Sequence, residues 1–260
     1  MIRPYLPSDR EQLVALWSRV FGDPPELVES FYELLPYMGS CCVVAESGRI
    51  LGMAHLIHGL TLWQSGQAPV TCGYLYGVAV AEEARGRGLG AALSRGAADL
   101  GRAEGSELIC TLPAEESLYQ WYEKILNLHC RSSRTVCEAD ALSVGCFRIS
   151  TAEYGYYRED LLQKTAHVEL NNAAMAFQAS LCETYGGGLY RSKDALFCAT
   201  CEDGVWRFPE VLPFAADTSV ADGASPFGSV LPQGLRSSIR PYLASEVPLP
   251  EGLVWNLTFD

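Results

Sequence analysis

The stretch that decides the fold is GVAVAEEARGRGLGAALSRGAADL, residues 77–100. It begins at the end of an apolar run, Tyr74 to Val80, which predicts a buried β-strand. After a turn of four residues, Arg85-Gly86-Arg87-Gly88-Leu89-Gly90 opens a predicted helix. The apolar face of that helix recurs at helical spacing and consists of Leu89, Leu93, Ala97 and Leu100.

The glycine-rich loop between this strand and helix is suited to bind an anion. Glycines let successive main-chain N–H groups converge on a phosphate without side-chain collision. The helix N-terminus adds a partial positive charge, and two arginines add whole charges. The residues that we expect to contact the anion are Arg85, Gly86, Arg87, Gly88, Leu89, Gly90 and Ala91.

Two other nucleotide-binding loops compete for this motif. Gly86-x-Gly88-x-x-Ala91 fits the relaxed dinucleotide-binding pattern, but four residues and an arginine separate it from the strand. The acidic residue expected about 20 positions later should end the next strand, whereas Glu107 begins it. A P-loop is excluded because no Gly-Lys-Ser/Thr follows.

Composition narrows the class of protein. The 260 residues are 48% hydrophobic and 19% charged, which predicts a well-packed chain of one or two domains. The formal net charge of -12 argues against a nucleic-acid partner and is compatible with a cationic amine. We find no export signal and no apolar run of the roughly 20 residues that a membrane span needs. We therefore expect a cytoplasmic protein with no membrane partner, whose ten cysteines are mostly buried free thiols.

The remaining patterns predict alternating helices and strands. Before the loop we expect a helix over Leu13 to Val20, a second one that Pro36 stops, and a hairpin of Cys41 to Glu46 with Arg49 to Ile57. After the loop, the expected elements up to residue 149 are a strand from Glu107 to Leu112, a helix from Glu115 to Lys124 and a strand from Ala139 to Ile149. Later we expect helices over Thr151 to Lys164 and Asn171 to Tyr185, then a hairpin of Leu196 to Cys201 with Val205 to Phe208. A tail rich in Pro, Gly and Ser follows from Pro213 to Pro250, and a short strand is expected from Leu253 to Phe259.

On these residues the chain resembles the GNAT acetyltransferase superfamily. Its acyl-CoA loop, Arg/Gln-x-x-Gly-x-Gly/Ala, is matched by Arg85, Gly88 and Gly90. The resemblance implies a GNAT fold, a mixed α/β (α+β) class with a central, mostly antiparallel twisted sheet flanked by helices. It also implies acetyl-CoA as co-substrate, main-chain contacts from Val78 and Val80 to the pantetheine arm, and often a homodimer.

The stretch Leu108 to Leu112 resembles the family's fifth strand, and Ser117 to Lys124 resembles the helix after it, where many members place a Tyr before a Glu-Lys pair. Tyr122 is thereby implied as the proton donor to the departing thiolate. The family continues with Gly-Phe, whereas this chain has Ile125-Leu126-Asn127-Leu128. Asn127 can adopt the left-handed conformation that glycine would supply.

The second part of the chain resembles the C-terminal region of long bacterial GNAT proteins, in which a degenerate GNAT-like half packs on the first. We expect a catalytic domain over residues 1–148 and a smaller accessory α/β domain over residues 149–260. The mycobacterial enhanced-intracellular-survival group, a distant tandem relative, places its C-terminal carboxylate in the active site. Asp260 is the residue here that would correspond to it.

Three functions compete at this point. The favoured one is an N-acetyltransferase in which a primary amine attacks the acetyl thioester directly. The others are an inactive acyl-CoA-binding sensor or scaffold, and an oxidoreductase with a relaxed dinucleotide loop. Glu115, Glu116, Asp260 and a water chain remain open as the base that deprotonates the amine. We expect no metal, because His55 and His58 face opposite sides of a strand and Cys198-x-x-Cys201 has no second pair.

Overall fold

The computed structural model of the chain describes residues 2–142, 145–214, 232–256 and 259. Its strands form one sheet in the order β1-β2-β3-β4-β5-β12-β6-β11-β10-β9-β7, and β8 pairs with β3 away from this path. The only parallel pair among the named strands is β4 with β5, as far as the described residues go. The mixed α/β class and the mostly antiparallel sheet predicted from the sequence are confirmed.

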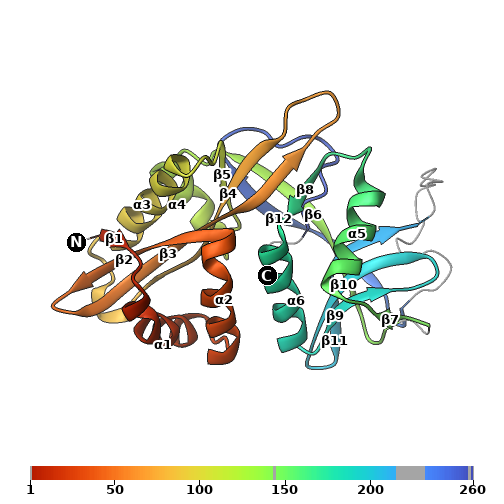
Figure 1. Cartoon of the computed structure of the whole chain (residues 1–260), viewed down its shortest axis with the longest axis horizontal. Coiled ribbons are helices and arrows are strands. Elements are labelled where there is room, and N and C mark those ends of the chain that lie inside the picture. The colour runs from red at the N-terminus through yellow and green to blue at the C-terminus, as the bar shows by residue number, and fades with distance from the viewer. Residues whose placement is uncertain (1, 143–144, 215–231, 257–258, 260) are drawn as a thin grey trace.

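Two layers of helices enclose the N-terminal strands (Figure 1). On one side lie α3 (Leu89–Ala103) and α4 (Glu116–Leu126), and on the other lie α1 (Arg10–Phe21) and α2 (Pro25–Met38). Between them run β1 (Ile2–Pro4), β2 (Gly39–Glu46), β3 (Arg49–Trp63), β4 (Val70–Val80) and β5 (Leu108–Thr111). This arrangement buries the apolar face of α3 through Leu93 and Ala97.

The C-terminal elements extend the same sheet (Figure 1). They comprise β7 (Phe147–Arg148), α5 (Thr151–Leu162), β8 (His167–Leu170), α6 (Asn172–Thr184), β9 (Gly188–Arg191), β10 (Ala195–Glu202) and β11 (Val205–Pro213). The last strand, β12 (Arg236–Ser245), lies between β5 and β6 (Cys130–Ala139). The two halves of the chain therefore share one sheet, and the division at residue 148 stays a prediction.

Three predicted elements were wrong. No strand spans the described part of Ala139 to Ile149; the strand β6 instead ends at Ala139. Exposed residues alternate with partly buried ones along most of β6, so its sequence has no apolar run that would predict a strand. The helix α2 continues through Pro36 to Met38, since a proline in the last turn removes little of the helical ladder. In the segment Leu253 to Phe259, the described residues form only an isolated bridge, between Val254 and His167.

Further strands were missed. The strand β12 lies inside the tail that looked irregular, β8 joins α5 to α6, and β9 lies between α6 and β10. No helix in the described part of the chain is long and apolar enough to cross a membrane.

Candidate active site

The strands β4 and β5 pair over four residues and then separate. Their parallel register ends at Leu75 and Thr111, while β4 continues for five more residues to Val80. Among the described strands, none pairs with this edge of β4 after Leu75. Main-chain N–H and C=O groups on such an edge are available to a ligand that carries amides. The half-buried residues Val78 and Val80 both lie in this segment.

A β-bulge shapes the same segment. The register between β3 and β4 shifts between Met53 and His55, so Gly77 and Val78 face one residue of β3. Gly77 has φ +56°, and a Cβ there would lie 3.0 Å from His55 Nδ1 and 3.2 Å from the Trp17 ring. Only glycine fits this position without strain.

The side chain of His55 packs against the bulge at Tyr76 and Gly77. Its Nε2 lies 2.9 Å from the Tyr32 hydroxyl, and its Nδ1 lies 3.3 Å from the Tyr76 carbonyl oxygen. Because a carbonyl can only accept, Nδ1 carries the proton and Nε2 accepts from Tyr32. Burial lowers the pKa of His55 to about 4. The ring is therefore neutral at physiological pH and serves as a support for β4.

The predicted anion loop surrounds a cavity of about 290 Å³ at the start of α3. Gly88 caps the helix with φ +75°, a left-handed conformation that exposes main-chain N–H groups at the helix N-terminus. Seven of the residues predicted for ligand contact line the cavity: Val80, Arg85, Gly86, Gly88, Leu89, Gly90 and Ala91. Ala84 and Trp121 also line it and were not predicted.

The two arginines of the loop differ in their surroundings. The Arg87 guanidinium forms an ion pair with Glu46 and does not line the cavity. Arg85 lines the cavity, and its Nε donates to the Val80 carbonyl over 3.4 Å. Arg85 has no carboxylate within ion-pair distance in the described part of the chain. It therefore presents an uncompensated positive charge to the cavity, whereas the ion pair of Arg87 with Glu46 joins the loop to the end of β2.

The side chain of Tyr122 lies where β4 and β5 separate. It projects from α4, is 6% exposed, and forms a hydrogen bond with the Thr111 hydroxyl. Burial raises the pKa of Tyr122 to about 12, and the Thr111 hydrogen bond lowers it in part. Thr111 in turn donates to the Leu75 carbonyl over 2.8 Å. The phenol is thus protonated at neutral pH, beside the last β4–β5 pair.

The turn after α4 has the conformation that the sequence analysis allowed. Asn127 is the C-cap of the helix, with φ +60° and ψ +30°. Its main-chain N–H donates to the Glu123 carbonyl over 2.9 Å. The left-handed turn at Asn127 is therefore confirmed.

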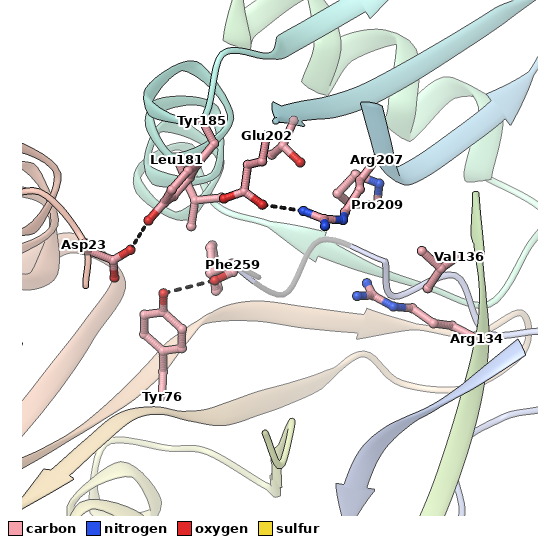
Figure 2. Close-up of a pocket in the computed structure, with 11 residues that line it drawn as sticks. Asp23, Tyr76, Arg134, Val136, Leu181, Tyr185, Glu202, Arg207, Pro209 and Phe259 are labelled. Atoms are coloured by element: carbon pink, nitrogen blue, oxygen red, sulfur yellow. Dashed lines mark hydrogen bonds and ion pairs between the residues drawn. The ribbon is translucent and has the colours of Figure 1, made fainter. Parts of the chain in front are cut away.

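A second cavity, of about 270 Å³, lies between the two halves of the chain (Figure 2). Tyr76 of β4 reaches it from below in the view, and its hydroxyl donates to the Phe259 carbonyl over 3.0 Å. Phe259 is buried, and its main-chain N–H donates to the Gln178 side chain over 3.0 Å. Because Tyr76 belongs to the segment of β4 that has left β5, this cavity adjoins the edge exposed by the separation.

Asp23 supplies a charge without a counter-ion to this cavity. Its Oδ2 accepts from Trp17 Nε1 over 2.7 Å, and its Oδ1 accepts from the Tyr185 hydroxyl (Figure 2). Both donors are neutral, and no ion pair to Asp23 exists among the described residues. Glu202, on the facing wall, is paired with Arg207. Asp23 is therefore the carboxylate of the cavity that is best placed to receive a cation.

The candidate bases Glu115 and Glu116 lie elsewhere. Both are exposed at the start of α4, where Glu115 accepts from Ser117 and Glu116 pairs with Arg131 over 2.6 Å. Neither lines the cavity between the halves. Asp260 lies outside the described residues.

No metal centre is formed within the described ranges, where no three His, Cys, Asp or Glu side chains gather around a common point. His58 pairs with Glu104 over 3.2 Å, away from the buried His55. Of the two cysteines in the close pair, Cys198 is fully buried and its Sγ lies 3.1 Å from that of Cys182. Packing thus accounts for its position.

Comparison with known proteins agrees with this geometry. The model of the acetyltransferase (GNAT) domain family matches residues 1–123. The chain is similar in structure to a GCN5-related N-acetyltransferase from Kribbella flavida, with a TM-score of 0.63 and 15% identity over 94% of this chain and 70% of that one. No curated protein sequence matches the chain.

Two further solved structures show the same likeness. Eis1 from Mycobacterium abscessus has a TM-score of 0.60 and 12% identity, over 94% of this chain and 73% of that one. A conserved protein of unknown function from Enterococcus faecalis has a TM-score of 0.60 and 12% identity, over 94% and 72%. At such identities the likeness shows a common fold. The family match assigns residues 1–123 to the GNAT acetyltransferase domain family, and the structural likeness shows that the chain has the fold of these GNAT proteins.

Proposed function

We propose that the protein transfers an acetyl group from acetyl-CoA to a primary amine by direct attack of the amine on the thioester. One observation carries this proposal: β4 separates from β5 after Leu75. The free segment of β4 then runs from the position of Tyr122 to the Arg85–Ala91 loop. The loop would hold the pyrophosphate. The free edge of β4 would pair with the pantetheine amides near Val78 and Val80, which brings the thioester close to Tyr122.

The acceptor would enter from the cavity between the two halves. A protonated amine is attracted to Asp23, whose charge is met only by neutral donors. The bound ammonium first loses one proton to water, because only the neutral amine attacks. The nitrogen then bonds to the thioester carbon, the C–S bond breaks, and the thiolate of CoA leaves.

Tyr122 would stabilise that thiolate. A thiol has an ordinary pKa of about 8.5, whereas burial holds the pKa of Tyr122 at about 12. Complete proton transfer is therefore uphill, and the hydroxyl acts chiefly as a hydrogen-bond donor to the developing negative charge. The second proton, which the nitrogen loses as the amide forms, can then reach the sulfur through this hydroxyl.

The oxidoreductase alternative loses its structural basis. A dinucleotide-binding fold requires a parallel sheet around the loop, whereas β4 is flanked by antiparallel β3 and parallel β5 and belongs to a GNAT sheet. The sensor alternative shares the acyl-CoA site and differs only in chemistry.

The direct test is release of CoA from acetyl-CoA in the presence of a panel of primary amines. Free CoA is best quantified by chromatography, because the partly accessible thiols of Cys130, Cys146 and Cys201 can react with a colorimetric thiol reagent. We expect at least one amine to raise CoA release above hydrolysis in the wild type, with the acetylated amine as co-product. Binding of acetyl-CoA without release across the panel would contradict transfer and favour the sensor.

A further inference from the structure

A third cavity, of about 400 Å³, lies between the middle of α3 and the end of α4. Its charged lining residues are Arg95, Asp99, Arg102, Glu123 and Lys124. Three cations at one place are notable in a chain with 19 Lys and Arg against 31 Asp and Glu. Most cations of such a chain are expected to find carboxylate partners.

Two of these three cations have no such partner. Arg102 is paired with Asp99 over 3.7 Å and with Glu246. Arg95 instead donates from Nε to the main-chain carbonyl of Ile125 over 3.2 Å, which orients the guanidinium without neutralising it. Neither Arg95 nor Lys124 takes part in an ion pair with any described residue. Their charges are available to an anionic ligand.

This cavity and the one at the acyl-CoA loop are separate, but both are lined by residues of α3 and α4. A Cβ on Gly90 would lie 3.6 Å from the Trp121 indole, and Arg95 reaches Ile125. The two helices therefore run side by side in the same direction, away from the loop. Arg95 lies five residues beyond Gly90, about 7.5 Å along the helix axis, and Lys124 follows Trp121 by about one turn.

We propose that Arg95 and Lys124 bind the 3′-phosphate of coenzyme A, with the indole of Trp121 beside the adenosine. This inference rests on the proposed function, because it requires CoA at the Arg85–Ala91 loop. Coenzyme A carries two anionic groups, the pyrophosphate and a ribose 3′-phosphate, joined through one adenosine. Arg85 in the loop would meet the pyrophosphate, and Arg95 on α3 and Lys124 on α4, which lie farther from the loop, would meet the 3′-phosphate.

The chemistry of each residue suits this assignment. A guanidinium gives planar, charge-assisted hydrogen bonds to phosphate oxygens, and an ammonium supplies a mobile point charge. An indole offers a stacking surface for a base. Glu123 lines the same cavity and carries the opposite charge, so it should weaken phosphate binding.

Comparison of CoA with 3′-dephospho-CoA tests the assignment by isothermal titration calorimetry. We expect the wild type to bind CoA about tenfold more tightly than dephospho-CoA. The Arg95→Ala/Lys124→Ala double variant should lose this preference and keep its affinity for dephospho-CoA. Glu123→Gln should increase the preference for CoA.

A matched control removes two charges elsewhere. Arg19 and Lys164 are exposed cations without an ion pair among the described residues, and neither lines the α3–α4 cavity. The Arg19→Ala/Lys164→Ala variant should retain the wild-type preference. Equal affinity of the wild type for CoA and dephospho-CoA would overturn the inference, as would an equal loss of preference in the control. Failure of both ligands to bind the wild type would instead overturn the proposed function.

Discussion

The Thr111 hydroxyl donates a hydrogen bond of 2.8 Å to the carbonyl oxygen of Leu75, its neighbour in the last β4–β5 pair. The same hydroxyl forms a hydrogen bond with the phenol of Tyr122. One side chain therefore fixes both the point at which the strands separate and the position of the hydroxyl expected beside the thioester sulfur.

Tyr122→Phe should lower kcat by roughly 100-fold, within the range for loss of a general acid, with little change in the Kd of acetyl-CoA. Because the pKa of Tyr122 is about 12, the wild-type rate should show no descending limb from this group up to pH 10. Steady-state kinetics from pH 6 to 10 provide the measurement. An unchanged kcat in the variant would exclude this role.

Arg85→Ala should weaken CoA binding about tenfold or more, because it removes a charge-assisted contact to the pyrophosphate. Arg87→Ala should weaken it less than about threefold, since the charge of Arg87 is already met by Glu46. Calorimetric titration of both variants with CoA makes the comparison. Equal losses would show that both arginines contact the ligand.

Asp23→Asn should raise KM for the acceptor amine at least about tenfold while the Kd of acetyl-CoA stays constant, because the variant keeps the shape and removes the charge. Tyr185→Phe is the matched control, since it removes one neutral donor to Asp23 and preserves the carboxylate. Its effect on KM should be smaller. A rise in KM that is equal in both variants would assign a purely structural role to Asp23.

His55 should make folding sensitive to acid. Its pKa is about 4 in the folded protein because of burial, and about 6.5 in the unfolded chain. Between these values only the unfolded state takes up the proton, so stability falls as pH falls. The contribution at pH 5 is about 2 kcal/mol relative to pH 8. Denaturant unfolding at both pH values should show a smaller difference in His55→Gln than in the wild type; an equal difference would contradict the assignment.

The buried ion pair of Arg158 and Glu210 should dominate the stability of the C-terminal elements. Both side chains are fully buried and joined by contacts of 2.9 and 3.1 Å, and Tyr154 donates to the same carboxylate over 2.9 Å. Glu210→Gln should cost about 3 kcal/mol in unfolding free energy, because it leaves the buried Arg158 with only the partly exposed Glu159 as counter-ion. The double change Arg158→Met/Glu210→Leu should cost clearly less. The reverse order in urea unfolding would contradict this prediction.

The loop of the candidate site was predictable because its signal is local. Glycines with positive φ at Gly86 and Gly88, an apolar strand before them and a periodic helix after them all lie within residues 74–100. The turn is predicted by backbone sterics at the glycines, and the helix is predicted by the spacing of its apolar residues.

The rest of the site depends on contacts between distant segments. The strand β12 is exposed over its first six residues and contains Pro241 beside a bulge, so it carries no strand pattern. Asp23 and Trp121 occupy a loop and a helix whose local sequence indicates nothing of the cavities they line. Their roles follow only from the way α6 and α4 pack against the N-terminal elements.

The most direct test of the central claim is the thermal shift produced by acetyl-CoA, CoA and NAD in the wild type and in an Arg85→Ala/Gly88→Glu variant. A ligand that binds only the folded state raises Tm by mass action. We predict that acetyl-CoA and CoA raise the Tm of the wild type and leave that of the variant unchanged, and that NAD has no effect on either. A wild-type Tm that responds to NAD alone, or to none of the three, would contradict an acyl-CoA site at this loop.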